Sequence, residues 1–75
     1  MTDKGELLTK DIGLKIKTLR LEQNLTQKQF AQKVGCHQDH ISRIEAGKIN
    51  LTLEYISKIA DILNVSVEII FKNKP

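Results

Sequence analysis

The chain has 75 residues, with 12 Lys and Arg side chains against nine Asp and Glu, which gives a net charge of +3. This length accommodates one small domain, and with three aromatic residues and no Trp its core must be aliphatic. The single cysteine excludes an intrachain disulfide, and we find neither a secretory signal nor an apolar run that could span a membrane. We expect one cytoplasmic domain over residues 1–75, with 1–8 as a loose leader and 72–75 as a fraying tail.

The first predicted element is a helix over residues 10–23. Its inward stripe has helical spacing and consists of Ile12, Ile16 and Leu19. Asn24 is the expected C-terminal stop.

Two short amphipathic patterns follow, joined by a turn at Gly35. Thr26 and Gln29 have the spacing of a capping box that opens the first of them. Gly35 suits the turn because glycine takes a positive φ without steric cost. The second pattern predicts a helix over residues 38–46. The apolar side chains on one side of the two patterns are Phe30, Ala31, Val34, Ile41 and Ile44. Two helices fixed at a steep angle in this way form a helix-turn-helix, whose second helix can enter the major groove of DNA.

Two more helices complete an all-α prediction. Residues 48–51 form a loop, after which Thr52 caps a helix that ends at Asn64. The expected inward face of that helix consists of Leu53, Ile56, Ile59, Ala60 and Leu63. Ser66 caps a short last helix over residues 67–71. Since no segment shows the alternation of a half-buried strand, the sequence predicts a compact five-helix domain.

This pattern resembles the lambda-repressor-like helix-turn-helix family, the Cro/CI or XRE type. The residues that carry the likeness are Arg20, the run Leu25-Thr26-Gln27, Ala31, Gly35, the run Ile41-Ser42-Arg43-Ile44-Glu45, and Gly47-Lys48. The likeness extends from Ile12 to Phe71. It implies a transcriptional regulator that binds double-stranded DNA, as phage repressors, restriction–modification controller proteins and antitoxins do.

The second helix of the motif supplies the candidate base readers, which are Gln38, Asp39, His40 and Arg43. The Gln38 amide can pair with adenine N6 and N7, and Arg43 suits guanine O6 and N7, or otherwise a phosphate. Asp39 can accept from cytosine N4 or repel misplaced phosphates, or it can simply stabilise the first helical turn. His40 would contact a base or the backbone and make binding sensitive to pH. The alternative for each is an ordinary solvated helix position.

Phosphate contacts are expected at helix starts and loops. Thr26 and Gln27 begin a helix whose N–H groups form an anion site, although ordinary capping also explains Thr26. The resemblance implies that Gln27 touches a phosphate and braces Gln38. It also implies phosphate roles for Ser42, Lys48 and Asn50.

The resemblance further implies a structural pair between Arg20 on the first helix and Glu45 at the end of the recognition helix. Such a pair would clamp the recognition helix to the scaffold. Burying one member without the other costs about 3–5 kcal/mol.

The sequence gives little support to metal binding or catalysis. Cys36, His37 and His40 do not complete a tetrahedral metal site, and a small apolar cysteine in the turn explains Cys36 better. The chain shows no phosphate-binding glycine loop and no nucleophile with its base. We therefore expect no metal, no cofactor and no enzymatic activity.

Apolar residues outside the expected core point to self-association. We predict an isologous homodimer through the last two helices, with an interface made of Tyr55, Ile62, Val67, Ile69, Ile70 and Phe71. Such a dimer predicts a two-fold symmetric operator with half-sites about 10 bp apart, or a multiple of one turn. Leu14 and Leu21 can instead receive the leader through Leu7 and Leu8. The rival function is a protein-interaction module of the same fold, and a polymerase or toxin is the partner it would take.

Overall fold

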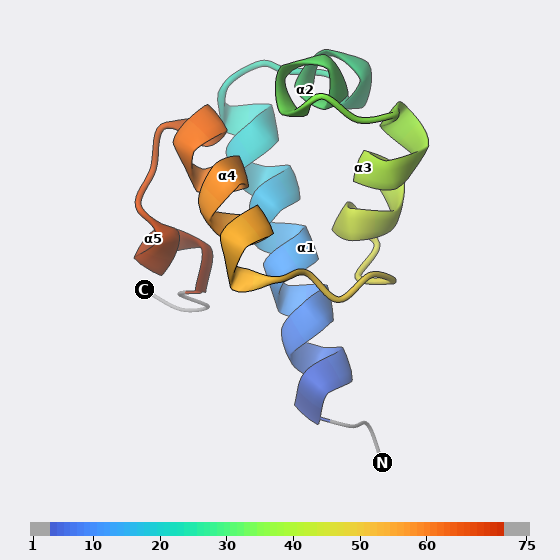
Figure 1. The fold of residues 1–75 in the computed structure, drawn as a ribbon, viewed down its shortest axis with the longest axis vertical. Coiled ribbons are helices and arrows are strands. Elements are labelled where there is room, and N and C mark those ends of the chain that lie inside the picture. The colour runs from blue at the N-terminus through green and yellow to red at the C-terminus, as the bar shows by residue number, and fades with distance from the viewer. Residues whose placement is uncertain (1–3, 72–75) are drawn as a thin grey trace.

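Helices make up all the regular structure in residues 4–71, the part of the chain that the computed structural model describes. They are α1 (Lys4–Glu22), α2 (Gln27–Val34), α3 (Gln38–Glu45), α4 (Leu53–Leu63) and α5 (Val67–Phe71). The long α1 runs through the middle of the molecule, with α4 and α5 on one side, α3 on the other and α2 across one end (Figure 1). The predicted all-α, five-helix fold is confirmed over these residues.

Short polar side chains and left-handed residues set the ends of α2 and α4. The Thr26 hydroxyl accepts from the Gln29 N–H (3.0 Å), and the Gln29 side chain accepts in return from the Thr26 N–H (2.9 Å), which confirms the capping box. Gly35 ends α2 at φ 88°. The Thr52 hydroxyl caps α4 by accepting from the Tyr55 N–H (3.1 Å). Positive φ values at the two predicted asparagine stops confirm them as well: Asn24 and Asn64, both at 60°.

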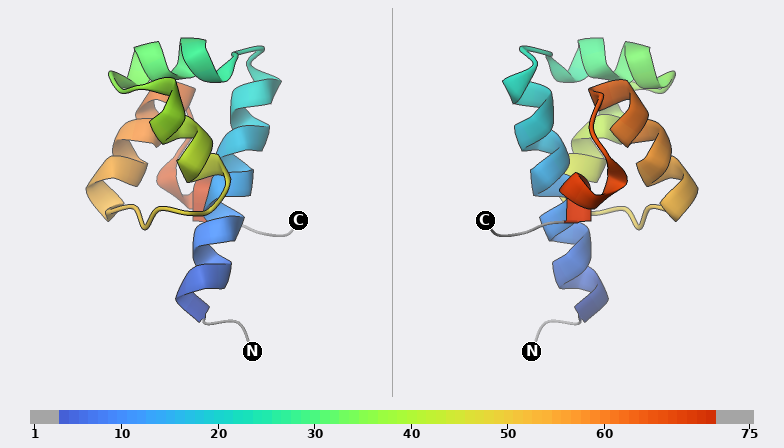
Figure 2. Two further views of the ribbon diagram at one scale, coloured as in Figure 1. Left: turned by 90° about the vertical axis from the view of Figure 1, so that its right-hand side faces the viewer. Right: turned by 90° about the vertical axis from the view of Figure 1, so that its left-hand side faces the viewer.

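The first helix begins earlier than the sequence predicts. Residues 4–8, expected as a loose leader, continue α1, which projects beyond the body of the molecule (Figure 2). The segment Lys4–Thr9 contains several good helix formers and no proline, and a helix that is already nucleated extends at little cost. Residues 1–3, the tail 72–75 and the side chains of Leu7 and Leu8 lie outside the described part of the chain.

The core is aliphatic apart from one phenylalanine. Its fully buried large side chains are Phe30, Ile16, Ile41, Ile44, Ile59, Leu63 and Ile70. Ile70 corrects the predicted dimer interface, because α5 packs against α1 and α4 and buries this side chain within the chain itself. Leu53 is a second correction, since it is 64% exposed. It occupies the first position of α4, where a side chain tilts toward the helix N-terminus and reaches past the core.

Gly13 allows α1 and α3 to approach closely. A Cβ atom at this buried position would overlap the carbonyl oxygen of Ile44 and lie 3.0 Å from that of Glu45. Both obstacles belong to the backbone at the end of α3, so they cannot rotate away. Glycine is therefore required here for packing, although it lowers the intrinsic stability of α1.

We predict that Gly13→Ala destabilises the protein. Helix propensity alone would stabilise the variant by about 1 kcal/mol, but forcing a methyl group against the α3 backbone costs about 1–3 kcal/mol. Urea unfolding should show a net loss, whereas Lys17→Ala on the exposed face of the same helix should change stability by less than about 0.5 kcal/mol. A Gly13→Ala variant more stable than the wild type would contradict the close approach.

Candidate nucleic-acid interface

The pair α2–α3 presents one polar flank to solvent. Ile41 and Ile44 anchor the inner side of α3 in the core, while Gln38, Ser42 and Arg43 on its other side are exposed. The left view of Figure 2 faces this helix, which lies at the surface of the molecule with no other helix covering it. An exposed helix held by a buried apolar side is the arrangement that a DNA groove can receive.

The four candidate base readers do not all lie together. Gln38, Asp39 and Arg43 are exposed, and Asp39 Oδ2 lies 3.3 Å from Arg43 Nε, one helical turn away. His40 is half-buried instead, with its ring edge-on to Tyr55 of α4 at a centroid separation of 5.8 Å. The structure thus groups three of the candidates on the exposed flank and directs His40 toward α4.

Tyr55 joins a small cluster behind the recognition helix. Burial, together with a hydrogen bond and charge interaction with Cys36, raises the pKa of Tyr55 to about 12. Lys58 Nζ lies 5.9 Å from the centroid of the same ring. Tyr55 was expected at a dimer interface; these contacts pack part of its half-buried side chain against its own chain.

The candidate phosphate contacts lie along the start of α2 and around the end of α3. The Asn50 side-chain oxygen accepts from the Thr9 hydroxyl (2.8 Å), which ties the loop after α3 to α1. Ser42 and Lys48 help to line an open hollow beside α3, with Asp39, Arg43, Ala46 and Ile49. This hollow joins the exposed flank to the loop. Two candidate base readers, Asp39 and Arg43, therefore share one surface with two candidate phosphate contacts, Ser42 and Lys48.

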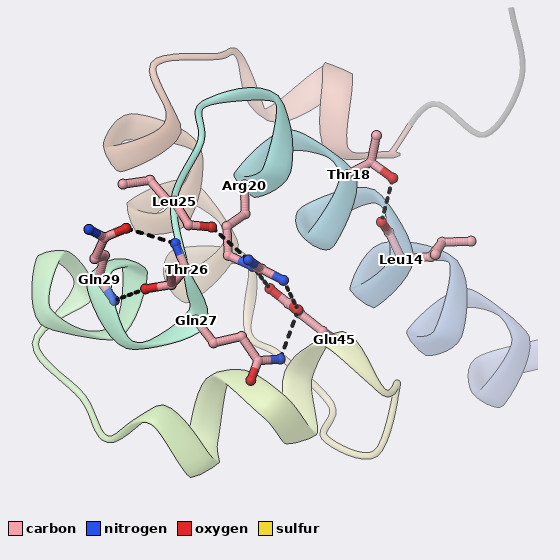
Figure 3. Close-up of polar contacts among 8 residues, drawn as sticks. All are labelled: Leu14, Thr18, Arg20, Leu25, Thr26, Gln27, Gln29 and Glu45. Atoms are coloured by element: carbon pink, nitrogen blue, oxygen red, sulfur yellow. Dashed lines mark hydrogen bonds and ion pairs between the residues drawn. The ribbon is translucent and has the colours of Figure 1, made fainter.

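Gln27 makes a contact within the chain that the resemblance did not imply. Its Nε2 donates to Glu45 Oε1 (3.1 Å), so the amide nitrogen is directed at the end of α3 (Figure 3). The reason is that Glu45 offers a buried carboxylate next to the first turn of α2, and an amide donor binds a charged acceptor more strongly than a neutral one.

Arg20 and Glu45 form the expected ion pair, and it is bidentate. Arg20 Nε and Nη2 donate to Glu45 Oε2 and Oε1 at 2.6 and 3.0 Å, and Arg20 Nη1 donates to the Leu25 carbonyl at 2.7 Å (Figure 3). The two side chains are only 6% and 3% exposed. The pair therefore joins α1, the segment before α2 and the end of α3.

Within residues 4–71, no three His, Cys, Asp or Glu side chains are grouped so as to hold a metal ion. None of the helices described here combines the length and the apolar character that crossing a membrane requires.

A model of the helix-turn-helix family (HTH_3) matches residues 16–70. The chain belongs to the XRE-type helix-turn-helix family of transcriptional regulators. It is 36% identical to the control protein C.BamHI of Bacillus amyloliquefaciens, over 87% of this chain and 78% of that protein. It is 32% identical to the immunity repressor of Bacillus phage phi105 (79% of this chain, 41% of the repressor). It is 41% identical to the antitoxin PezA of Streptococcus pneumoniae (84% of this chain, 40% of PezA).

Solved structures share the fold. An HTH_3-family transcriptional regulator from Vibrio cholerae superposes with a TM-score of 0.86 at 28% identity, over 96% of this chain and 40% of that one. The restriction–modification controller protein C.AhdI from Aeromonas hydrophila superposes with a TM-score of 0.84 at 23% identity, over 92% of this chain and all of the controller.

Two features around the site escaped the sequence analysis. The contact of Gly13 with α3 depends on tertiary packing, and an isolated glycine inside a helix was its only signal. The cluster of Cys36, His40 and Tyr55 joins the turn, α3 and α4, and no local spacing brings those residues together.

We predict that Tyr55, the only tyrosine, titrates near pH 12 in the folded protein and near its ordinary pKa of 10 in denaturant. Because the folded pKa is the higher one, the contribution of Tyr55 to stability is complete below pH 10 and is lost as the pH rises toward 12. Tyrosinate absorbance measures both values. Cys36→Ala should lower the folded pKa only partly, since burial is the larger cause. A folded pKa equal to the unfolded one would show that the ring is not buried against the turn.

Proposed function

We propose that the chain is a cytoplasmic, sequence-specific DNA-binding regulator of transcription that occupies a two-fold symmetric operator as a homodimer. The observation that carries this proposal is the exposed polar flank of α3, with Gln38 at its first position and Arg43 five residues further on. The opposite side of the same helix is buried in an aliphatic core. An apolar outer flank would have suited a protein partner better.

In this proposal the N-terminal turns of α3 enter the major groove, where base edges differ in their pattern of donors and acceptors. Gln38 reads adenine through its amide. The start of α2 at Thr26 meets the DNA backbone, because N–H groups and the helix dipole both favour an anion there. Ser42 and Lys48, beside the hollow next to α3, contact phosphates and fix the register of the domain on the duplex.

Dimerisation is proposed through the outer surface of α5 and the end of α4. Ile69 and Phe71 are exposed, and with Val67 and Glu68 they line a mainly apolar hollow. A chain of this size gains stability from covering such a surface. Ile62 and Val67 are half-buried and extend the patch, whereas Ile70 belongs to the core.

The likeness to C.BamHI and to the phi105 immunity repressor supports a role as a restriction–modification controller or a phage-type repressor. A second candidate, the DNA-binding part of an antitoxin, is favoured by the likeness to PezA. Because this chain covers 40% of PezA, that likeness says nothing about a toxin-binding region. Neither candidate requires a cofactor or an enzymatic step.

We predict that binding to a random duplex depends steeply on salt. About six to ten phosphate contacts per dimer give a log–log slope near −5 to −9. Lys48→Ala should weaken binding to all sequences alike and reduce the slope by about one per contact removed. Lys33→Ala, an exposed lysine at the end of α2, is the matched control and should change neither. A flat salt response of the wild type would favour a protein-interaction module.

We predict that Phe71→Glu shifts the protein from dimer to monomer in sedimentation equilibrium and weakens binding to a two-half-site duplex more than to a single half-site. Leu14→Glu is the control, since Leu14 is a more exposed apolar residue (61% against 39%) but lies on α1. A dimer that survives Phe71→Glu but dissociates with Leu14→Glu would place the interface on α1.

A further inference from the structure

Asp39 and Arg43 form an ion pair on the flank of α3 that the proposed function turns toward DNA. The pair joins Asp39 Oδ2 to Arg43 Nε at 3.3 Å, and the two side chains are 76% and 63% exposed. Exposed pairs of this kind contribute little to stability. The pair therefore contributes little to the fold, and its effect on function lies in which Arg43 atoms it leaves for a ligand.

The atoms used by the pair determine what remains for a ligand. A guanidinium carries five N–H donors, of which Nε has one and the two Nη atoms have four. Because Asp39 lies at Nε, the Nη edge is left to make the two parallel hydrogen bonds that guanine O6 and N7 accept. The carboxylate also retains Oδ1, which can accept from the N4 amino group of a cytosine.

The charge of the pair argues against a phosphate ligand for Arg43. A phosphate is attracted by net positive charge, and the adjacent carboxylate cancels that of Arg43 at short range. Guanine O6 and N7 are uncharged acceptors, so their hydrogen bonds to Arg43 do not require a net positive charge at the pair. Lys48, which lines the same hollow, is the residue whose chemistry suits the backbone.

We infer that Asp39 positions Arg43 to read guanine, so that each half-site of the operator contains a G·C base pair beneath the first two turns of α3. This inference rests on the proposed function and assigns the chemical class of one base pair. Asp39 acts as a positioning residue for Arg43. Its carboxylate also disfavours any placement of the DNA backbone that would bring a phosphate beside it.

The test selects binding sites for the wild type from a random duplex library, then measures affinity for all four base pairs at each selected position. Arg43→Ala should lose the preference for G·C at one position by roughly 5- to 150-fold and leave the preference at other positions intact. Asp39→Asn should reduce the preference at that same position. Asp61→Asn, which removes an exposed carboxylate from α4, is the matched control and should leave every preference unchanged. All three variants change exposed side chains, and circular dichroism checks their folding.

Two results would overturn the inference while leaving the proposed function intact. In the first, Arg43→Ala weakens binding to every sequence equally and lowers the salt slope, as loss of a phosphate contact would. In the second, Asp39→Asn leaves the preference at the Arg43 position unchanged. If the wild type selects no sequence at all, the proposed function and the inference fail together.

Discussion

The carboxylate of Glu45 is the point on which the placement of the recognition helix depends. It ends α3, receives Arg20 from α1 through two hydrogen bonds, and receives Gln27 from the first turn of α2 through a third. A buried carboxylate without such partners would cost several kcal/mol. Since one group satisfies donors from both helices, it fixes α2 and α3 to each other and to α1.

The core and the caps turn this local constraint into a rigid surface. Ile41 and Ile44 fix the inner side of α3, and Gly13 removes the side chain that would hold α3 away from α1. These contacts position the inner side of α3, and the ion pair at its end fixes the orientation of the outer flank relative to the scaffold. A buried ion pair is weak evidence for stability, and its value here lies in determining how the helices are oriented.

Local signals predicted the fold well. The capping box at Thr26 and the left-handed turn at Gly35 act within a few residues, so they could be recognised without tertiary information. The failures depend on packing between distant segments. Ile70 is apolar like its neighbours, and it is buried only because α5 packs against α1 and α4. The bond from the Gln27 amide to Glu45 was not predicted either, because only the folded chain places that buried carboxylate beside the first turn of α2.

A double-mutant cycle over Arg20 and Glu45, with unfolding free energy and selected-duplex affinity measured on each variant, tests the central role of the ion pair most directly. Glu45→Leu alone should cost about 3–5 kcal/mol, because Arg20 stays buried without a counter-charge. Adding Arg20→Met should restore most of the stability, since an apolar pair of similar volume is often as stable. The orienting role of the ion pair predicts that the restored variant still binds the selected duplex more weakly than the wild type, because α3 is no longer held in one orientation. Wild-type affinity in that stable double variant would contradict it.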